Sequence, residues 1–305
     1  MCEGRQPGDA RLREVAGGIF AYVQPDGGWC LNNAGVIVSD GECALVDTAA
    51  TETRARALRR VVRSVAPDPP RLVINTHSHG DHTFGNFVFP EAVVIGQERA
   101  RTEMTEVGLH LTSLWPEVAW GELRLVVPQV VFDRQLTLHI GTLRAELLHP
   151  GIAHTAGDAA VWLPRERVLF TGDLAMSGVS PFVPMGSVAG SLAALDALRA
   201  LEPRVVVPGH GPVGGPEILD DTMAYLRLVQ RLAEDGLAAG LGPAAIAERA
   251  DLGRFARWLD AERLVPNLHR ARAEASGAEP GSPLDMNVLF ADMTAFHGGV
   301  PACHA

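Results

Sequence analysis

Three histidines and one aspartate lie close together directly after a predicted buried strand. Residues 76–82 read THSHGDH, which places His77, His79, Asp81 and His82 at the spacing His-x-His-x-Asp-His. Imidazole and carboxylate are ligands that divalent transition metals prefer, zinc above all. With 11 histidines in 305 residues, a chance match to all four positions is expected in roughly one chain in a thousand of this composition. The spacing therefore predicts a metal site.

Three more candidate ligands each follow a predicted strand. They are His154 in PGIAHTAGD, Asp173 in TGD and His210 in PGHGP. Taken singly, each is a common turn or surface residue, but loops at the carboxyl ends of strands converge on one crevice in an α/β sheet. Seven ligands are too many for one tetrahedral ion and suit two ions that share a carboxylate and a water. The other histidines lack metal spacing and are expected at the surface or in the core: His110, His139, His149, His269, His297 and His304.

Short apolar runs and amphipathic segments must position these side chains. A hairpin is predicted for 34–47 around Asp40-Gly41, because a short polar-glycine turn separates two apolar runs. A meander of strands is expected over 123–168, beginning with LRLVVP. Strands alternate with helices in this half of the chain, which predicts an α/β core. The further strands are expected at 71–76, 93–96, 168–171 and 204–207, and the helices at 51–66, 98–114 and 191–201.

The pattern changes after Pro216. Residues 217–239, 243–250 and 260–275 have helical periodicity, and we find no strand pattern there. We therefore expect a catalytic core over 12–215 and a helical extension over 216–305 that packs on the core. The extension could cap the site or serve for packing only.

Composition excludes several classes of protein. The longest apolar runs fall far short of the roughly 20 residues that cross a bilayer, and the N-terminus is charged and has no apolar signal segment, so a cytoplasmic protein without membrane contact is expected. The net charge of -10 opposes binding to nucleic acid, which needs clustered cations. Without a C-x-x-C pair, the cysteines are expected to be reduced and non-catalytic: Cys2, Cys30, Cys43 and Cys303.

The stretch NTHSHGDH, followed by the single His, the Gly-Asp and the Pro-Gly-His-Gly between 35 and 211, resembles the metallo-β-lactamase fold hydrolases. This resemblance implies a four-layer αβ/βα sandwich with two Zn²⁺ ions, for which iron or manganese are alternatives. It implies that Asp173 bridges the metals and that Asp81 also orients a bridging water and shuttles its proton. The implied ligands are His77, His79 and His154 for the first metal and Asp81, His82 and His210 for the second. Some lactamases have Cys at the second site, so the His here is closer to the glyoxalase II type.

Segments outside the metal motifs resemble the zinc-dependent cyclases of bacterial aromatic polyketide pathways. They are 27–35 (GGWCLNNAG), 108–123, 176–203 and 259–271. The resemblance implies a polyketide cyclase and thioesterase of antibiotic biosynthesis, which closes a ring by intramolecular aldol condensation and cleaves the thioester to an acyl carrier protein. Apolar side chains suited to a flat substrate, or simply to the core, are Trp29, Leu111, Trp115, Met176, Phe182 and Met185.

The carrier protein is acidic and so is this chain, so binding would need a local basic patch. The arginines of 54–63, and Arg99 with Arg101, are candidates, although each could be a solvated face. The oligomeric state stays open.

Other functions compete with this one. A glyoxalase II-like or other small-thioester or ester hydrolase would use the same metals, and the arginines of the helical extension are compatible with it. A β-lactamase would need an export signal. A metal-stabilised binding protein would be expected to have lost ligands, and a nuclease would need a basic, aromatic-rich tract.

Overall fold

Residues 10–305 are described by a computed structural model of the chain, and two mixed β-sheets form its centre. The first sheet has seven strands in chain order. Strands β1 to β4 are antiparallel neighbours and β4 to β7 are parallel, and the predicted hairpin at Asp40-Gly41 joins β3 and β4. The strands are β1 (Arg11–Ala16), β2 (Ile19–Val23), β3 (Ala34–Ser39), β4 (Glu42–Val46), β5 (Leu72–Ile74), β6 (Val93–Gln97) and β7 (Val130–Phe132).

The second sheet has five strands in the order β12-β11-β10-β9-β8. Strands β11 and β12 are parallel, and the other neighbours are antiparallel. The strands are β8 (Gln135–Ile140), β9 (Leu143–Leu148), β10 (Ala160–Leu163), β11 (Val168–Met176) and β12 (Val205–His210).

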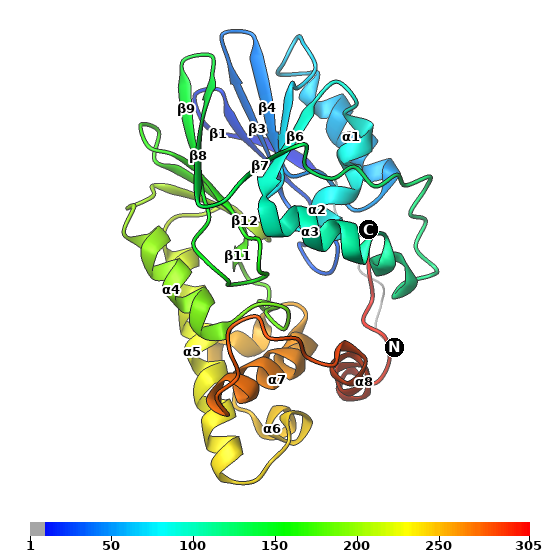
Figure 1. The fold of residues 1–305 in the computed structure, drawn as a ribbon, viewed down its shortest axis with the longest axis vertical. Helices are drawn as coiled ribbons and strands as arrows, with labels where there is room; N and C mark the ends of the chain where they lie inside the picture. The colour runs from blue at the N-terminus through cyan, green and yellow to red at the C-terminus, as the bar shows by residue number, and fades with distance from the viewer. Residues whose placement is uncertain (1–9) are drawn as a thin grey trace.

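Helices cover the outer faces of both sheets. In Figure 1, α1 and α3 lie beside the first sheet, α4 and α5 lie beside the second, and α6 to α8 gather at one end of the molecule. The helices are α1 (Glu52–Val62), α2 (Gly80–Thr83), α3 (Glu98–Val107), α4 (Val188–Arg199), α5 (Glu217–Ala238), α6 (Pro243–Arg249), α7 (Leu264–Ala275) and α8 (Met286–His297). The four-layer αβ/βα arrangement expected from the sequence is confirmed.

The alternation of side chains along each strand builds three apolar layers. In the first sheet, Ile37 and Ile74 face the second sheet, while Val36 and Val73 pack with Leu58 of α1 on the outside. The second sheet repeats this pattern. Phe170 and Val207 face inward, whereas Leu169 and Val206 pack with the helices on the outer side. This period of two fixes which side chains are buried between the two sheets and which pack against the helices outside.

Some predicted elements are wrong in detail. The run LRLVVP at 123–128 forms no strand, and β7 begins only after Pro128, which has no amide hydrogen for a ladder. The helix predicted over 98–114 ends at Val107, because Gly108 adopts a positive φ of 59° and starts a turn. Strands β1 and β2 and helix α8 were not predicted.

The helical extension shares its apolar packing with the core. The predicted boundary between 215 and 216 lies between β12 and α5. One buried cluster contains Leu169 and Val206 of the sheet together with Leu219, Tyr225 and Leu268 of α5 and α7. No helix among residues 10–305 is long and apolar enough to span a bilayer.

Candidate metal centre

The carboxyl ends of strands from both sheets meet at one edge. Strand β5 leads into the loop with His77 and His79, β11 carries Asp173, and β12 ends at His210. His154 follows β9, and Asp81 and His82 lie in the short helix α2. The structure brings all seven predicted side chains together in two groups, each with potential ligand atoms within 4.8 Å of one another. The groups are His77, His79, His154 and Asp173, and Asp81, His82 and His210. Their role as metal ligands stays a prediction.

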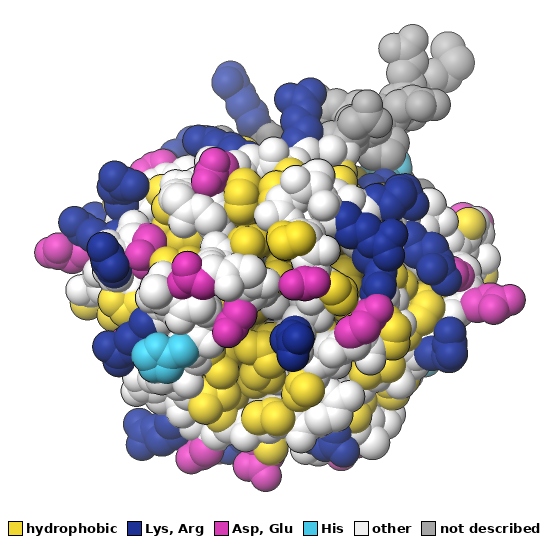
Figure 2. All heavy atoms as spheres, turned by 90° about the horizontal axis from the view of Figure 1, so that it is seen from above, with side chains coloured by type: hydrophobic (Ala, Val, Ile, Leu, Met, Phe, Trp, Pro, Cys, Tyr) yellow, Lys and Arg dark blue, Asp and Glu magenta, His cyan; other side chains and the backbone are white. Residues whose placement is uncertain are grey.

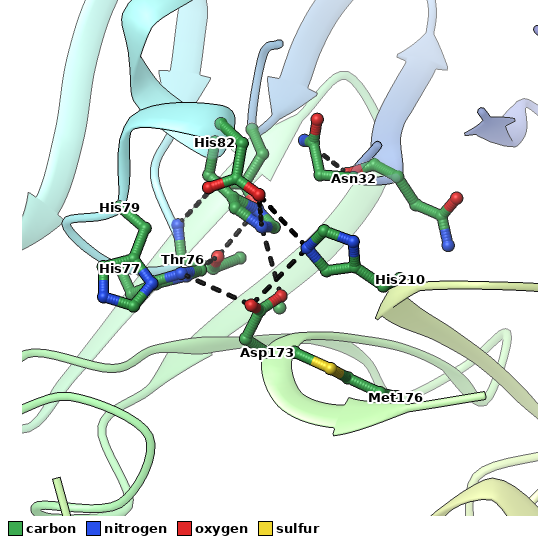
Figure 3. Close-up of polar contacts among 12 residues, drawn as sticks. Asn32, Thr76, His77, His79, His82, Asp173, Met176 and His210 are labelled. Carbon is green, nitrogen blue, oxygen red and sulfur yellow. Dashed lines mark hydrogen bonds and ion pairs between the residues drawn. The ribbon is translucent and has the colours of Figure 1, made fainter. Parts of the chain in front are cut away.

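Asp173 lies between the two groups (Figure 3). Its Oδ2 is 3.5 Å from Nε2 of His154 and 3.9 Å from Nε2 of His77 in the first group. Its Oδ1 is 3.1 Å from Nε2 of His82, and its Oδ2 is 3.6 Å from Nε2 of His210 in the second. A carboxylate at this position can contact cations in both groups, which is the arrangement needed by a bridging ligand.

Gly209 allows this close packing of β11 against β12. A Cβ at this position would collide with Oδ1 of Asp173. Glycine is therefore required at 209 for the carboxylate and His210 to share the site. In the Pro-Gly-His-Gly motif, Gly209 is therefore needed for steric reasons, and His210 is the candidate ligand.

Hydrogen bonds at the far side of the rings set the orientation of three histidines. Nδ1 of His82 lies 2.8 Å from Oδ2 of Asp47, and Nδ1 of His210 lies 3.0 Å from the carbonyl of Gly27. Both partners only accept, so each Nδ1 carries the hydrogen. The hydroxyl of Thr76 donates to Asp47 at 2.7 Å, so its oxygen is left to accept from Nδ1 of His77 at 3.0 Å. All three rings therefore direct Nε2 into the centre, as metal ligands require.

The polar atoms directed inward find few partners in the described part of the chain. Nε2 of His77 is buried without a hydrogen bond, and Nε2 of His82 faces the carboxylate of Asp173, at 3.1 Å. Nε2 of His154 faces Nδ1 of His79 at 3.0 Å, so two ring lone pairs meet unless a proton or a cation lies between them. Buried polar atoms without partners are costly. The donor set therefore fits divalent cations, and nitrogen with carboxylate oxygen is compatible with zinc.

Burial and charge divide the histidines by protonation. Burial lowers the pKa of His77 and of His79, and lowers the pKa of His154 to about 3, so these rings are neutral at pH 7. Burial also opposes the charged form of His82, but the negative charges of Asp173, Asp47 and Asp81 outweigh it and raise the pKa of His82 well above its usual value. Without metal, these charges therefore favour the protonated form of His82.

Asp47 is a functional candidate that sequence reasoning missed. It is 2% exposed, follows β4 and has a positive φ of 60°. Its carboxylate accepts from the amide and hydroxyl of Thr76, both at 2.7 Å, as well as from His82. It therefore positions one ring in each metal group. Its place directly after a strand, like the other polar residues of the site, is the signal that could have identified it.

Three of the predicted substrate-lining residues form one aromatic cluster. The ring of Trp29 lies 5.2 Å from Phe182 at a steep angle and 5.5 Å from Trp115. All three rings are less than 10% exposed and belong to the apolar cluster that reaches the helical extension. Leu111 and Met185 are half-buried and pack against the same cluster. We call Trp29, Trp115 and Phe182 the aromatic cluster.

Met176 is not part of the aromatic cluster; it lies close to the metal centre (Figure 3), opposite His210 where β11 pairs with β12. It is fully buried, its sulfur contacts Nη1 of Arg263 at 3.4 Å, and it lines a cavity of about 210 Å³ together with Ile218 and Trp258. None of the seven predicted ligands lines this cavity. A role for Met176 in substrate binding stays a prediction.

Helix α7 and the turn before it fasten the segments that carry the aromatic cluster. Nε1 of Trp29 donates to Glu262 at 2.6 Å, and the guanidinium of Arg263 lies 4.0 Å from the Trp29 ring. Asn267 donates to the carbonyl of Pro181 and accepts from the amide of Val183, on either side of Phe182. The buried guanidinium of Arg270 donates to the carbonyl of Pro184. The extension thus acts as a rigid support for these segments.

The arginines of α1 differ in their surroundings. Arg56 pairs with Glu52 at 2.7 Å, and Arg59 pairs with Glu91 at 2.6 Å. Arg60 and Arg63 are exposed and have no ion pair among the described residues. Figure 2 shows basic side chains gathered on the side of the molecule where α1 lies in Figure 1.

Comparisons with known proteins assign the chain to a family. A family model described as the metallo-β-lactamase superfamily matches residues 27–210. The chain is 24% identical over 223 residues to a metallo-β-lactamase type 2 of Bacteroides fragilis, an alignment that covers 70% of this chain and 84% of that protein. It is also 28% identical over 208 residues to the 2,4-dinitroanisole O-demethylase subunit alpha of a Nocardioides species, covering 67% of this chain and 56% of that subunit.

Solved structures show the same fold. A metallo-β-lactamase from Pontibacter korlensis superimposes with a TM-score of 0.60 at 20% identity, over 72% of this chain and 99% of that one. At this identity the likeness establishes the fold alone. About a quarter of this chain lies outside the superposition.

Proposed function

Because the chain belongs to the metallo-β-lactamase superfamily, we propose that it is a dinuclear metal-dependent cyclase and thioesterase. Its substrate would be an aromatic polyketide intermediate bound to an acyl carrier protein. The reaction would close a ring by intramolecular aldol condensation and cleave the thioester. The observation that carries this proposal is the aromatic cluster, whose three large rings are held by the helical extension on segments that also lead to the metal centre.

The metal centre determines which kinds of reaction the protein can catalyse. Two divalent cations, when bound, would polarise a carbonyl oxygen and lower the pKa of water at the site. The protein's own part is to hold the ring nitrogens and carboxylates in fixed orientation through Asp47, Thr76 and the Gly27 carbonyl. An aldol condensation and a thioester cleavage both develop negative charge on an oxygen, so one preorganised site can serve both steps.

Asp81 is the residue we assign to proton transfer. Its Oδ2 lies 3.2 Å from Nε2 of His210, and the histidines around it lower its pKa well below the usual range against the effect of burial. Its carboxylate is therefore ionised at neutral pH. An ionised carboxylate at the centre can accept a proton from a carbon acid or from water.

The aromatic cluster supports a flat, unsaturated substrate over a small one. Trp29 comes two residues after Gly27, whose carbonyl accepts from Nδ1 of His210, so one segment carries both the ring and a contact to the metal centre. Stacked and edge-on aromatic contacts favour planar ligands. The names of the relatives refer to a β-lactam and to 2,4-dinitroanisole, so family membership alone does not select a substrate.

An acidic carrier protein would bind at the basic side of the molecule. Arg60 and Arg63 of α1 are the best candidates, because Arg56 and Arg59 already pair with glutamates. Unpaired surface charges change the rate of association and its salt dependence more than they change the final affinity.

Product analysis tests the proposal. The zinc-loaded enzyme is incubated with acyl carrier protein that carries a poly-β-ketone chain, and the products are identified by mass spectrometry. A cyclised product released from the carrier protein supports the proposal. Release of the linear acid only, with rapid turnover of S-lactoylglutathione, would instead identify a small-thioester hydrolase, and turnover of a cephalosporin would identify a β-lactamase.

Matched tryptophan variants sharpen this test. Trp29→Leu should lower kcat/KM for the polyketide by roughly tenfold or more while hydrolysis of a short acyl thioester changes little, since a short acyl chain has no rings to contact the aromatic cluster. Trp162→Leu is the control, because Trp162 is a tryptophan of similar burial that lies within strand β10. Equal losses for both substrates in Trp29→Leu would argue that Trp29 has only a structural role.

A further inference from the structure

Glu103 of α3 holds two loops of the first metal group together. Its side chain is half-buried and uses both oxygens of the carboxylate. Oε2 accepts the hydroxyl hydrogen of Ser78 at 2.6 Å, and Oε1 accepts the amide hydrogen of Ala156 at 3.2 Å. Ser78 directly precedes His79, and Ala156 comes two residues after His154. One side chain therefore joins the loop of His79 to the loop of His154.

The rings of His79 and His154 lack the support that orients the other three histidines of the centre. His77, His82 and His210 each have a hydrogen bond at Nδ1. By contrast, Nδ1 of His154 is buried without a hydrogen bond, and the ring of His79 has no hydrogen-bonding contact among residues 10–305 except His154 itself. Metal-ligating histidines are normally oriented by a hydrogen bond at the second ring nitrogen. The direction of these two rings therefore depends on the position of their loops.

The loop that follows β9 is packed closely against α3. A Cβ on Gly157 would collide with the amide nitrogen of Ala100, which lies in the first turn of this helix. Within the loop, the carboxylate of Asp158 accepts from the amide of Thr155 at 2.9 Å and from its hydroxyl at 2.7 Å. These contacts make the loop a compact unit, so a hydrogen bond to its backbone fixes the whole loop relative to α3.

We propose that Glu103 is a positioning residue for the first metal group, which sets the distance between His79 and His154 by holding their loops on α3. The inference rests on the metal centre of the proposed function but not on the choice of substrate. Nδ1 of His79 and Nε2 of His154 lie 3.0 Å apart. Two nitrogens that ligate one tetrahedral zinc ion are about 3.3 Å apart. Without Glu103 each loop can move, and the two nitrogens lose this separation.

The second metal group does not depend on this carboxylate. Asp81 and His82 lie in α2, and His210 lies at the end of β12. Among the described residues, the hydrogen bonds of the Glu103 carboxylate go to Ser78 and Ala156 and to none of these three. Removing Glu103 should therefore weaken binding of the first cation selectively. A residue that only stabilises the fold would weaken binding of both cations together.

Variants with a single intact group allow the two zinc affinities to be measured separately. His210→Ala removes a candidate ligand of the second group, and His77→Ala removes one of the first. Competition against a chelator then gives the zinc affinity of the group that remains. In the His210→Ala protein, adding Glu103→Ala should lower this affinity by roughly 10- to 100-fold. In the His77→Ala protein, the same substitution should change it by less than about twofold, because the remaining group shares no contact with Glu103.

Milder variants separate the geometry of Glu103 from its charge. In Glu103→Gln the amide oxygen can accept from Ala156 and the NH₂ group can donate to the hydroxyl of Ser78, so most of the zinc affinity should be retained. Ser78→Ala removes one of the two hydrogen bonds and should lose part of the affinity. It should add no further loss once Glu103→Ala is present, because both act through the same contact. Glu106→Ala, at an exposed position of the same helix, is the matched control.

Amide hydrogen exchange provides a readout that needs no metal. In metal-free protein, Glu103→Ala should speed exchange at the amide of Ala156 by roughly tenfold or more, because this amide loses its acceptor. Exchange in β11 should stay slow, which also shows that the variant is folded. Glu106→Ala should match the parent protein at both places.

Three results would each overturn the positioning role. They are equal losses of zinc affinity at both groups, an unchanged affinity at the first group in Glu103→Ala, and a loss in Glu103→Gln as large as in Glu103→Ala. If the parent protein binds no zinc at either group, the metal centre of the proposed function fails and this inference fails with it. If the parent protein binds zinc but releases no cyclised product, only the proposed substrate is wrong, and the selective loss at the first group still supports the role of Glu103.

Discussion

Oδ2 of Asp47 lies 2.8 Å from Nδ1 of His82, and the same oxygen accepts the hydroxyl hydrogen of Thr76. Thr76 in turn accepts from Nδ1 of His77, so one buried carboxylate controls a ring in each metal group. The two groups are thereby coupled through the protein as well as through Asp173. Orientation of ligands by such outer partners commonly contributes 10- to 100-fold in metal affinity.

Asp47→Asn should lower the affinity for the second cation by roughly 10- to 100-fold and leave the fold intact. An amide can present its NH₂ group to Nδ1 of His82, which would move the ring hydrogen to Nε2 and remove the lone pair that faces the metal. Zinc competition against a chelator measures the effect. Asp68→Asn, at an exposed position, is the matched control, and equal affinities for the two variants would contradict the assigned role.

Asp173→Ala should reduce metal content more than His79→Ala does. Asp173 lies within 3.9 Å of a ring nitrogen in each group, whereas His79 belongs to the first group only. Elemental analysis after equilibration with zinc should therefore give close to zero ions per chain for Asp173→Ala and about one for His79→Ala. Circular dichroism checks that both variants fold. One ion retained in each would argue that Asp173 does not bridge.

Metal binding to the second group should depend more steeply on pH than binding to the first. The charges of Asp173, Asp47 and Asp81 raise the pKa of His82 well above its usual value, so a cation must displace its proton, whereas burial keeps His77, His79 and His154 neutral. Between about pH 6 and the raised pKa of His82, affinity at the second group should rise about tenfold per pH unit.

Calorimetric zinc titrations in two buffers of different ionisation enthalpy measure this release at pH 7. We expect about one proton to accompany the second cation and none the first. Asp47→Asn should reduce the release, because Asp47 is one of the charges that raise the pKa of His82. Release of a full proton with the first cation would reverse the assignment of the protonated ring.

The sequence indicated which side chains cluster at the site more accurately than it indicated the bounds of the surrounding strands and helices. The His-x-His-x-Asp-His spacing and the strand-end positions of His154, Asp173 and His210 pointed to seven side chains that the structure brings together in two groups, because loops at the carboxyl ends of neighbouring strands converge. Their role as metal ligands stays a prediction. Strands β1 and β2 were missed since β1 is largely exposed and carries charges. Asp47 and the support from α7 were missed because they depend on contacts between residues far apart in the chain.

Arg263→Ala should destabilise the protein by about 3 kcal/mol at pH 8. The guanidinium is 2% exposed, pairs with Asp260 at 2.7 Å and donates to the carbonyl of Ser180. Burial already raises the pKa of Asp260 against the effect of Arg263, so removing the cation raises it further. At pH 5 the freed carboxyl can take a proton, and the loss should be smaller than at pH 8.

Urea unfolding of metal-free protein at the two pH values measures this difference. Arg257→Ala, at an exposed position of the same extension, should stay within about 0.5 kcal/mol of the parent protein. An equal loss at pH 5 and pH 8 would show that Asp260 is not the group left without a partner.

Asp81→Asn should lose far more rate than metal. An amide oxygen at this position can still contact a cation weakly, but it cannot accept a proton, so kcat should fall by roughly 100-fold or more while zinc content changes little at saturating metal. His82→Gln, which removes a neighbouring ring in the same group, should lose metal and rate together. Measuring kcat and bound zinc on the same preparations separates the two effects. Parallel losses in Asp81→Asn would leave Asp81 as a ligand only, and proton transfer would then have to be assigned to another group.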